Sequence, residues 1–248
     1  MRPLHCLLIA GMLISGGAYP AAAQETIKAY TADLPPWTNE GNEARPGFAL
    51  EVMREMVTRS GLNIEIEMTP WRRAQEDMKT TPNTMGFHLF RTPEREASYD
   101  WHFSILESQV AFVSTDKPVN SIEEAKGLAR VVVVAGTPQE AEMKNAGADN
   151  LEIVDKVEAA VRMLESGRVD AFYTIAQRAS YAWSEAGFPL DKLVMGEPQR
   201  VDELFIASSK QMPAGSMEKL KAAFDSMKDD GTYAAIAKKY FGEQKKAS

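Results

Sequence analysis

Segments with the period of a strand and segments with the period of a helix alternate along most of this 248-residue chain. Residues 64–68 alternate apolar and charged side chains, as strands do, whereas residues 48–60 carry apolar residues at the spacing of one helix face. The same alternation returns between residues 121 and 186, where Val131–Val134 is typical of a buried strand. Strands that alternate with helices form layered α/β units with largely parallel sheets, so the sequence predicts two such units.

The end of the chain indicates how the two units are connected. After a predicted strand at residues 203–208, the chain continues into two amphipathic helices that have no strands of their own. We therefore expect these helices to pack back on the first unit, which requires two crossovers between the units. The predicted boundaries are 24–113 and 206–248 for a first lobe, 114–205 for a second lobe, and 1–23 for an export leader.

The predicted leader has the three parts of an export signal. Arg2 gives a positive start, residues 7–14 are almost wholly apolar, and Ala21–Ala23 supplies small residues before Gln24. The apolar stretch is shorter than the roughly 20 residues that a membrane-spanning helix needs. We expect cleavage near Ala23 and a location in the periplasm.

Composition excludes several classes of function. Cys6, the only cysteine, lies inside the predicted leader, so the exported chain would hold no disulfide, thiolate metal site or thiol nucleophile. Loss of Arg2 makes the net charge one unit more negative than the −7 of the full chain, which argues against nucleic acid as a partner. No nucleophile elbow, phosphate-binding loop or dinucleotide motif is present. The sequence predicts a monomeric binding protein with no cofactor, no metal site and no catalytic activity.

Several short motifs follow one another in order. They are Leu34-Pro35-Pro36-Trp37, Gly47-Phe48, Thr92-Pro93-Glu94-Arg95 with Asp100-Trp101, Val134-Ala135-Gly136-Thr137, Ser166-Gly167-Arg168-Val169-Asp170-Ala171, and Asp230-Gly231-Thr232-Tyr233 with Lys238-Lys239-Tyr240-Phe241. In this order they resemble the family 3 bacterial extracellular solute-binding proteins, of the amino-acid-binding type, over essentially the whole chain after the leader.

The resemblance implies the type II periplasmic binding protein fold. In that α/β fold, each of two lobes is a mixed, mostly parallel sheet flanked by helices, and two hinge crossovers let the lobes close on a ligand. It also implies delivery of the ligand to an ABC transporter permease or, less often, to a membrane sensor.

Arg95 matches the arginine with which the family binds an α-carboxylate from the first lobe. A guanidinium suits this role because its planar donors match a carboxylate and it stays charged when desolvated. The alternative is a structural salt bridge to Glu94 or Asp100.

The strand-to-helix junction at Gly136, Thr137 and Pro138 matches the segment that contacts the same carboxylate from the second lobe. Thr137 has the position of an N-cap, Pro138 the first helical position, and Glu140 completes a capping box. We expect free backbone N–H groups and the positive end of the helix dipole to face an anion there. The alternative is that Thr137 is only a helix cap.

An aromatic-lined pocket is the third expectation. Trp71 matches a position that the family often places against the ligand, and His88 and Phe90 share one face of a predicted strand. Each of the three has a purely structural alternative. The remaining candidate ligand-binding residues are Trp37, Thr174, and Arg73 and Arg91, which add positive charge near the expected cleft. The alternative for each arginine is a solvated surface position or a structural ion pair.

Two departures from the family pattern bear on the ligand. Phe90 stands where amino-acid binders place a hydroxyl residue, and Ile175 stands where they often place an acid that pairs with the ligand ammonium. Because an unpaired ammonium is costly to bury, we expect a small anion with an apolar or aromatic body, unless Glu140 or Glu185 supplies the missing acid. An enzymatic alternative, a periplasmic cyclohexadienyl dehydratase, is less favoured because residues 174–182 contain no acid.

Overall fold

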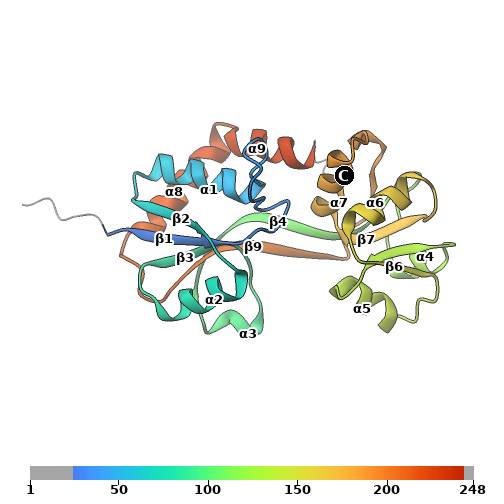
Figure 1. Ribbon diagram of the computed structural model, residues 1–248, viewed down its shortest axis with the longest axis horizontal. Coiled ribbons are helices and arrows are strands. Elements are labelled where there is room, and N and C mark those ends of the chain that lie inside the picture. Colours follow the sequence, from blue (N-terminus) through green and yellow to red (C-terminus); the bar gives the residue numbers. More distant parts are fainter. Residues whose placement is uncertain (1–24, 243–248) are drawn as a thin grey trace, which may run out of the picture.

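The computed structural model describes residues 25–242, which form two lobes joined by one continuous mixed sheet (Figure 1). The predicted leader at residues 1–23 and the last residues of the predicted first lobe, 243–248, lie outside the described part of the chain. Two long antiparallel strands run from one lobe to the other through the middle of the molecule (Figure 1).

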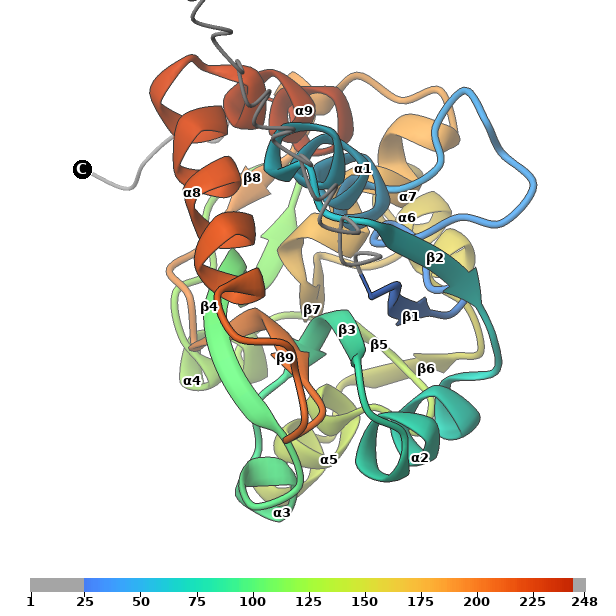
Figure 2. The ribbon, with the colours of Figure 1, turned by 90° about the vertical axis from the view of Figure 1, so that its left-hand side faces the viewer.

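The first lobe combines the two ends of the described chain. Its strands are β1 (Ile27–Thr31), β2 (Ile64–Met68), β3 (Thr84–Phe90) and the greater parts of β4 (Asp100–Ser114) and β9 (Arg200–Ser208). Its helices are α1 (Phe48–Ser60), α2 (Trp71–Thr80), α3 (Pro93–Glu96), α8 (Ser216–Asp229) and α9 (Thr232–Phe241). Helices α1, α8 and α9 cover one face of the sheet, and α2 and α3 lie on the other (Figure 2).

The second lobe is contiguous in sequence. Its strands are the end of β4, β5 (Val131–Val134), β6 (Leu151–Val154), β7 (Ala171–Ile175) and β8 (Val194–Met195). Its helices are α4 (Ile122–Lys126), α5 (Pro138–Asn145), α6 (Val157–Glu165), α7 (Ala176–Glu185) and the short 3₁₀ helix η1 (Leu190–Lys192). Helices α6 and α7 pack on one face of these strands, and α4 and α5 pack on the other.

The sheet order explains how the lobes are joined. The strands follow the order β2-β1-β3-β9-β4-β7-β5-β6, and β8 pairs with β4 beside this path. The neighbours of β1, which are β2 and β3, run parallel to it, whereas β9 pairs antiparallel with both β3 and β4. Strands β4 and β9 are continuous through the transition between lobes, so the expected boundaries at residues 113/114 and 205/206 stay a prediction.

Local sequence accounts for most element bounds. Helix α1 buries Ala49, Val52, Met53 and Met56 at helical spacing and ends at Gly61, whose φ of 63° is a left-handed conformation that glycine adopts without steric cost. The predicted helix at residues 48–60 is therefore confirmed. The sequence did not predict helix α3 or the first part of β4.

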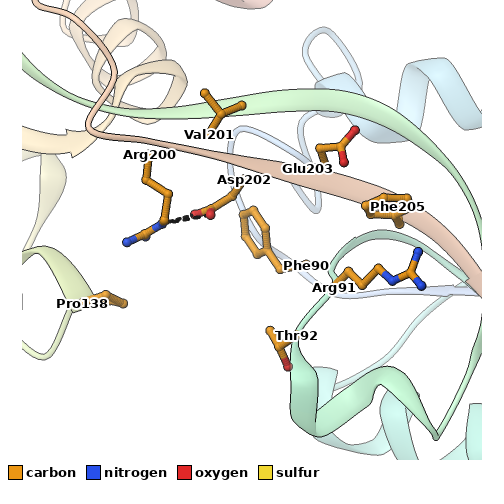
Figure 3. Close-up of a pocket in the computed structure, with 9 residues that line it drawn as sticks. All are labelled: Phe90, Arg91, Thr92, Pro138, Arg200, Val201, Asp202, Glu203 and Phe205. Atoms are coloured by element: carbon orange, nitrogen blue, oxygen red, sulfur yellow. Dashed lines mark hydrogen bonds and ion pairs between the residues drawn. The ribbon is translucent and has the colours of Figure 1, made fainter.

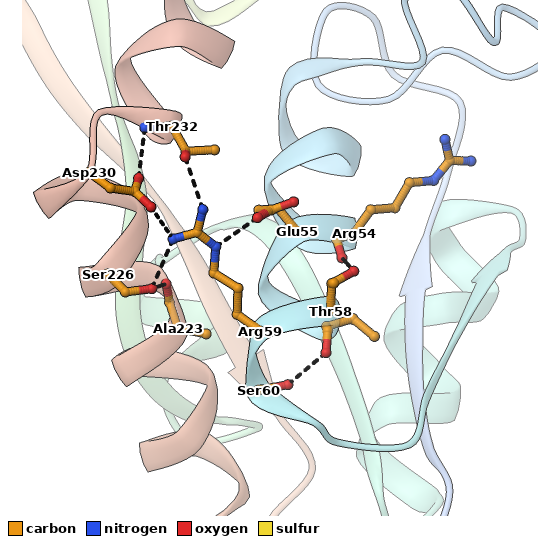
Figure 4. Close-up of polar contacts among 10 residues, drawn as sticks. Arg54, Glu55, Thr58, Arg59, Ser60, Ala223, Ser226, Asp230 and Thr232 are labelled. Atoms are coloured by element: carbon orange, nitrogen blue, oxygen red, sulfur yellow. Dashed lines mark hydrogen bonds and ion pairs between the residues drawn. The ribbon is translucent and has the colours of Figure 1, made fainter.

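The C-terminal helices are tied to the first lobe by both apolar packing and a polar cluster. Leu220, Phe224 and Tyr240 belong to the same core as Phe48 and Met53 of α1. At the end of α1, Arg59 donates hydrogen bonds to Glu55 at 2.7 Å, Asp230 at 2.7 Å, Ser226 at 3.1 Å and Thr232 at 2.9 Å (Figure 4). This cluster fixes the turn between α8 and α9 beside α1.

Candidate functional site

A cleft of about 500 Å³ lies between the two lobes on the side where α3 and α5 project from the sheet (Figures 1 and 3). Its lining comes from the β3–α3 connection of the first lobe, from β9, and from the start of α5 in the second lobe. The lining residues are Phe90, Arg91, Thr92, Pro138, Arg200, Val201, Asp202, Glu203 and Phe205. Three of the sequence-predicted residues, Phe90, Arg91 and Pro138, are therefore brought together here.

The first-lobe wall of the cleft begins at an irregularity in β3. The pairing of β3 with β9 shifts register between Phe87 and Leu89, and the intervening His88 has a φ of 71°. Few residues other than glycine adopt this left-handed backbone, and such strain persists only where the surroundings hold it in place. Because a bulge changes the direction of the residues that follow, it determines how Phe90 and Arg91 reach the cleft.

His88 is buried and held by two partners, Thr31 and Trp71. Its side chain is 3% exposed, its Nε2 and the Oγ1 of Thr31 share a hydrogen bond of 2.8 Å, and its ring stacks on Trp71 with 5.3 Å between centroids. Burial lowers the pKa of His88 to about 4, so the ring is neutral at pH 7. The stack places Trp71, at the start of α2, next to β3, although neither ring lines the cleft.

Arg91 is paired within its own lobe. Its Nε donates to Glu96 at 2.8 Å, and its guanidinium lies over the rings of Trp101 and Phe205 at 5.6 and 5.7 Å. The bond to Glu96 raises the pKa of Arg91 above its usual value. Arg91 therefore contributes a fixed positive charge to the cleft, close to an acid of the same lobe.

Arg95 lies on α3, just behind the cleft wall. It is half-buried, and its Nη1 donates to the backbone carbonyl of Phe90 at 3.1 Å. Among the described residues, neither Glu94 nor Asp100 forms an ion pair with it, which leaves the structural alternative without support from this geometry. Its role as a carboxylate ligand stays a prediction.

Two further candidates lie away from the cleft. Arg73 projects into solvent with 73% of its side chain exposed and lies 3.5 Å from Asp77. Trp37 is 6% exposed and packs against Phe241 in the main core of the first lobe. The structure thus places both outside the cleft lining.

The second-lobe junction has the expected cap but a different hydrogen-bond arrangement. Thr137 Oγ1 accepts from the N–H of Glu140 at 3.3 Å, and Glu140 Oε2 accepts from the N–H of Gly136 at 2.6 Å. The carboxylate of Glu140 therefore satisfies a backbone donor that the sequence analysis left for an anion. Lys144 and the Gly136 N–H together lower the pKa of Glu140.

Thr174 and Ile175 lie where β7 meets α7. Thr174 is 6% exposed and pairs with Ala111 of β4, and Ile175 precedes the first residue of α7. Neither residue lines the cleft.

The sequence analysis missed the contribution of β9. Arg200 and Asp202 project from the same side of this strand toward the cleft (Figure 3), and Arg200 Nε donates to both carboxylate oxygens of Asp202 at 2.9 Å. Arg200 Nη1 also donates to Glu142 of α5, whose other oxygen accepts from Tyr173 at 2.6 Å. The period-two spacing of Arg200 and Asp202 was the available signal, but it does not reveal which surface the strand faces.

Two other kinds of feature are absent from the described residues. Between residues 25 and 242, no group of three or more His, Cys, Asp and Glu side chains is placed to hold a metal ion. In the same range no helix has the length and apolar character needed to cross a membrane.

The two lobes, their shared sheet and the cleft between them define a type II periplasmic binding protein fold. A structure of a polar amino acid ABC uptake transporter substrate-binding protein from Streptococcus thermophilus matches with a TM-score of 0.73 and 19% identity, over 88% of this chain and 86% of that one. An ancestral cationic amino acid solute-binding protein, AncCDT-1, matches with a TM-score of 0.71 and 21% identity, over 87% and 95%.

The sequence also matches a family model directly. The model for bacterial extracellular solute-binding proteins, family 3, covers residues 27–243, so the chain belongs to this family. Among curated relatives, the L-cystine-binding protein TcyA of Bacillus subtilis (strain 168) is 27% identical over 202 residues, covering 79% of this chain and 73% of that protein. The expected family and fold are confirmed.

Proposed function

We propose that this protein captures a small carboxylate-bearing molecule between its two lobes and delivers it to an ABC importer. The observation that carries the proposal is the cleft of about 500 Å³, whose lining includes Phe90–Thr92 from one lobe and Pro138 from the other. A site split between two lobes is completed only when they approach, which is the mechanism of hinge closure around a ligand. We also propose that the protein acts in the periplasm as a monomer, after cleavage of the leader near Ala23.

The charges of the cleft bear on the class of ligand. Arg91 and Arg200 supply positive charge, while Asp202 and Glu203 supply an equal number of negative groups. Arg95, beside the wall, is the additional cation that supports a carboxylate. We also propose that the ligand is an anion without an ammonium group. Because Asp202 and Glu203 of β9 could pair with an ammonium, this preference is tested first.

A thermal-shift screen tests the proposal. Each carboxylate is assayed beside its α-amino counterpart, with aromatic and aliphatic bodies in both series. A ligand at 100 times its dissociation constant stabilises the folded protein by about 2.7 kcal/mol, which is readily detected. Calorimetry then measures the affinity of every compound that raises the melting temperature. If no carboxylate in either series binds, the proposal is wrong. If only amino acids bind, the ligand is a carboxylate, but the preference against an ammonium is refuted.

The protein is proposed to catalyse no reaction. Of the two acids that line the cleft, Asp202 is engaged by Arg200 through both carboxylate oxygens, so Glu203 is the acid whose role in a dehydration the following assay tests. Incubation with a cyclohexadienyl carboxylate, followed by ultraviolet absorbance, should show no formation of an aromatic product. Appearance of that product would establish the enzymatic alternative.

A sensory partner is the second candidate. A histidine kinase sensor domain with similarity to periplasmic binding proteins matches with a TM-score of 0.60 and 18% identity, over 88% of this chain and 97% of that one. Such a partner would also recognise the closed, ligand-bound arrangement of the lobes. The neighbouring genes separate the alternatives: permease genes support the importer, whereas a histidine kinase gene supports the sensor.

A further inference from the structure

A second set of contacts joins the lobes on the face of the sheet opposite the cleft. The loop between β1 and α1 reaches α7 of the second lobe there, near α9 (Figure 1). Asn39 Nδ2 donates to the hydroxyl of Tyr181 at 2.9 Å, and Arg45 Nη1 donates to Ser184 at 3.3 Å and to Glu185.

Arg45 is the centre of these contacts. Its side chain is 23% exposed, and its guanidinium lies 4.9 Å from the ring centroid of Tyr181 and 5.5 Å from that of Tyr240. Its Nη2 also donates to the backbone carbonyl of Lys239 in α9 at 3.1 Å. One side chain thus links the first lobe to α7 by an ion pair with Glu185, a hydrogen bond to Ser184 and a cation–π contact with Tyr181, and its contacts with Tyr240 and Lys239 hold it on α9 of its own lobe.

On the cleft side of the sheet, Arg200 joins strand β9 to Glu142 of α5, but no such contact reaches the first-lobe wall. Among the hydrogen bonds of residues 25–242, none joins the β3–α3 segment, residues 90–96, to α5 across the cleft. Helices α9 and α7, where Arg45 makes its contacts, lie on one side of β4 and β9, and α3 and α5, which flank the cleft, lie on the other (Figure 1). A rotation about these two strands that narrows the cleft must therefore separate the loop at residues 39–45 from α7.

We propose that Arg45, with Asn39 and their α7 partners, forms a latch that favours the open arrangement of the lobes and thereby sets ligand affinity without touching the ligand. The proposal rests on the function proposed above, in which closure of the lobes completes the site. The latch contacts exist only when the lobes are apart, so they stabilise the open state relative to the closed one. Ligand binding must overcome this free-energy difference between the open and closed states. The apparent affinity is therefore reduced in proportion to the small fraction of protein that is closed before the ligand binds.

Removal of the latch should raise the closed fraction of the protein and strengthen ligand binding. Arg45→Ala should increase the closed fraction of the ligand-free protein about tenfold, because it removes the ion pair with Glu185, the hydrogen bond to Ser184 and the cation–π contact with Tyr181, all of which join the two lobes. The apparent dissociation constant of any ligand that binds in the cleft should fall by up to the same factor. A residue that merely supported the fold would lower affinity or leave it unchanged.

The decisive experiment needs no ligand. Spin labels are attached to Ala97→Cys at the end of α3 and Ala141→Cys on α5, two exposed positions on the cleft side, in a full-length chain with Cys6→Ser. Distances between the labels are measured by pulsed electron resonance in the Arg45→Ala and unmodified backgrounds. The matched control is Lys28→Ala, which removes an exposed ion pair with Glu67 at 3.1 Å between β1 and β2 of the first lobe, away from the loop at residues 39–45.

The latch predicts a new population at shorter distance in Arg45→Ala and an unchanged distribution in Lys28→Ala. An unchanged distribution in Arg45→Ala, or a shift to longer distances, overturns it. If Arg45→Ala does not fold, Tyr181→Phe decides, because it removes only the hydroxyl bonded to Asn39 and should give a smaller shift in the same direction. Failure of every carboxylate to bind would count against the proposed function and would leave the distance result standing.

Discussion

The two walls of the cleft are held in place by different kinds of contact. On the first-lobe side, His88 is fixed by Thr31 and Trp71, which are distant in sequence. On the second-lobe side, the groups that could meet a ligand are satisfied within one turn of the chain, where Glu140 bonds to Gly136. The first wall is therefore shaped by tertiary packing before a ligand arrives, whereas the second can exchange its internal partner for a ligand.

The largest effect should come from Arg95 on the first-lobe side. Arg95→Ala should weaken ligand binding by at least about 30-fold, since removing one partner of a desolvated charged pair costs roughly 2–5 kcal/mol. The fold should be unaffected, because the only hydrogen bond described for its side chain is the one to Phe90 O. Calorimetry with a ligand found by screening measures the loss.

Two companion variants make the Arg95 result specific. Arg95→Lys should also bind poorly, because lysine keeps the charge but loses the planar donor pair. Arg73→Ala removes a solvent-exposed arginine and should leave affinity unchanged. A melting temperature many degrees lower for ligand-free Arg95→Ala would instead make Arg95 a structural residue.

The next largest effect concerns the same first-lobe wall and is a dependence of protein stability on pH through His88. The pKa of His88 is lowered from 6.5 to about 4, so the unfolded chain binds a proton before the folded protein does. The neutral His88 ring should therefore cost no free energy of unfolding above pH 6.5. As the pH decreases to about 4, its preference for the neutral form should lower the free energy of unfolding by roughly 3 kcal/mol. His88→Asn, which tolerates the left-handed backbone, should remove this slope.

Urea unfolding at a series of pH values, compared between the two proteins, isolates the contribution of His88 from that of the carboxyl groups. His102→Asn is a useful control, since burial also lowers the pKa of the less buried His102 and its effect should be smaller. A His88→Asn protein with the same pH slope as the parent would show that the His88 ring titrates normally.

The smallest effect is expected at the second wall. Glu140→Gln removes the negative charge at this helix end and the ion pair with Lys144, while its amide oxygen can still accept from Gly136 N–H, so an anionic ligand no longer meets a like charge there. Affinity for a carboxylate should rise about twofold to fivefold, the range given by an anion at a helix N-terminus. Glu158→Gln, in the first turn of α6, is the matched control. Equal affinity in Glu140→Gln and the parent would show that this helix end does not contact the ligand.

Local pattern predicted the elements well where neighbouring residues decide the structure. The apolar spacing of residues 48–60 and the glycine after them define α1, and Ser121 with Glu124 defines the start of α4. The cap at Thr137 was found in the same way. In each case the contacts span three or four residues, so the sequence contains the complete signal.

The missed features depend on contacts between distant residues. The left-handed backbone of His88 arises from pairing with β9, and nothing in its neighbours indicates it. Arg200 and Asp202 reach the cleft only because β9 lies between β3 and β4, a position fixed by partners about 100 residues away in the chain. Comparison with the family pattern indicated Phe90 and Pro138, and its charge indicated Arg91, but neither signal carried information about this strand.

The central position of β9 in the sheet also affects the order in which the two lobes can fold during synthesis. While the chain is being synthesised, β3 and the first part of β4 are made long before β9, their shared neighbour in the sheet. The second lobe needs only a contiguous stretch of chain, so its strands can pair early, whereas the first lobe must wait for a contact of long sequence separation. An early truncation would therefore leave an incomplete first lobe with two unpaired strand edges, and the sheet that carries the hinge is completed only when residues 200–208 become free to insert.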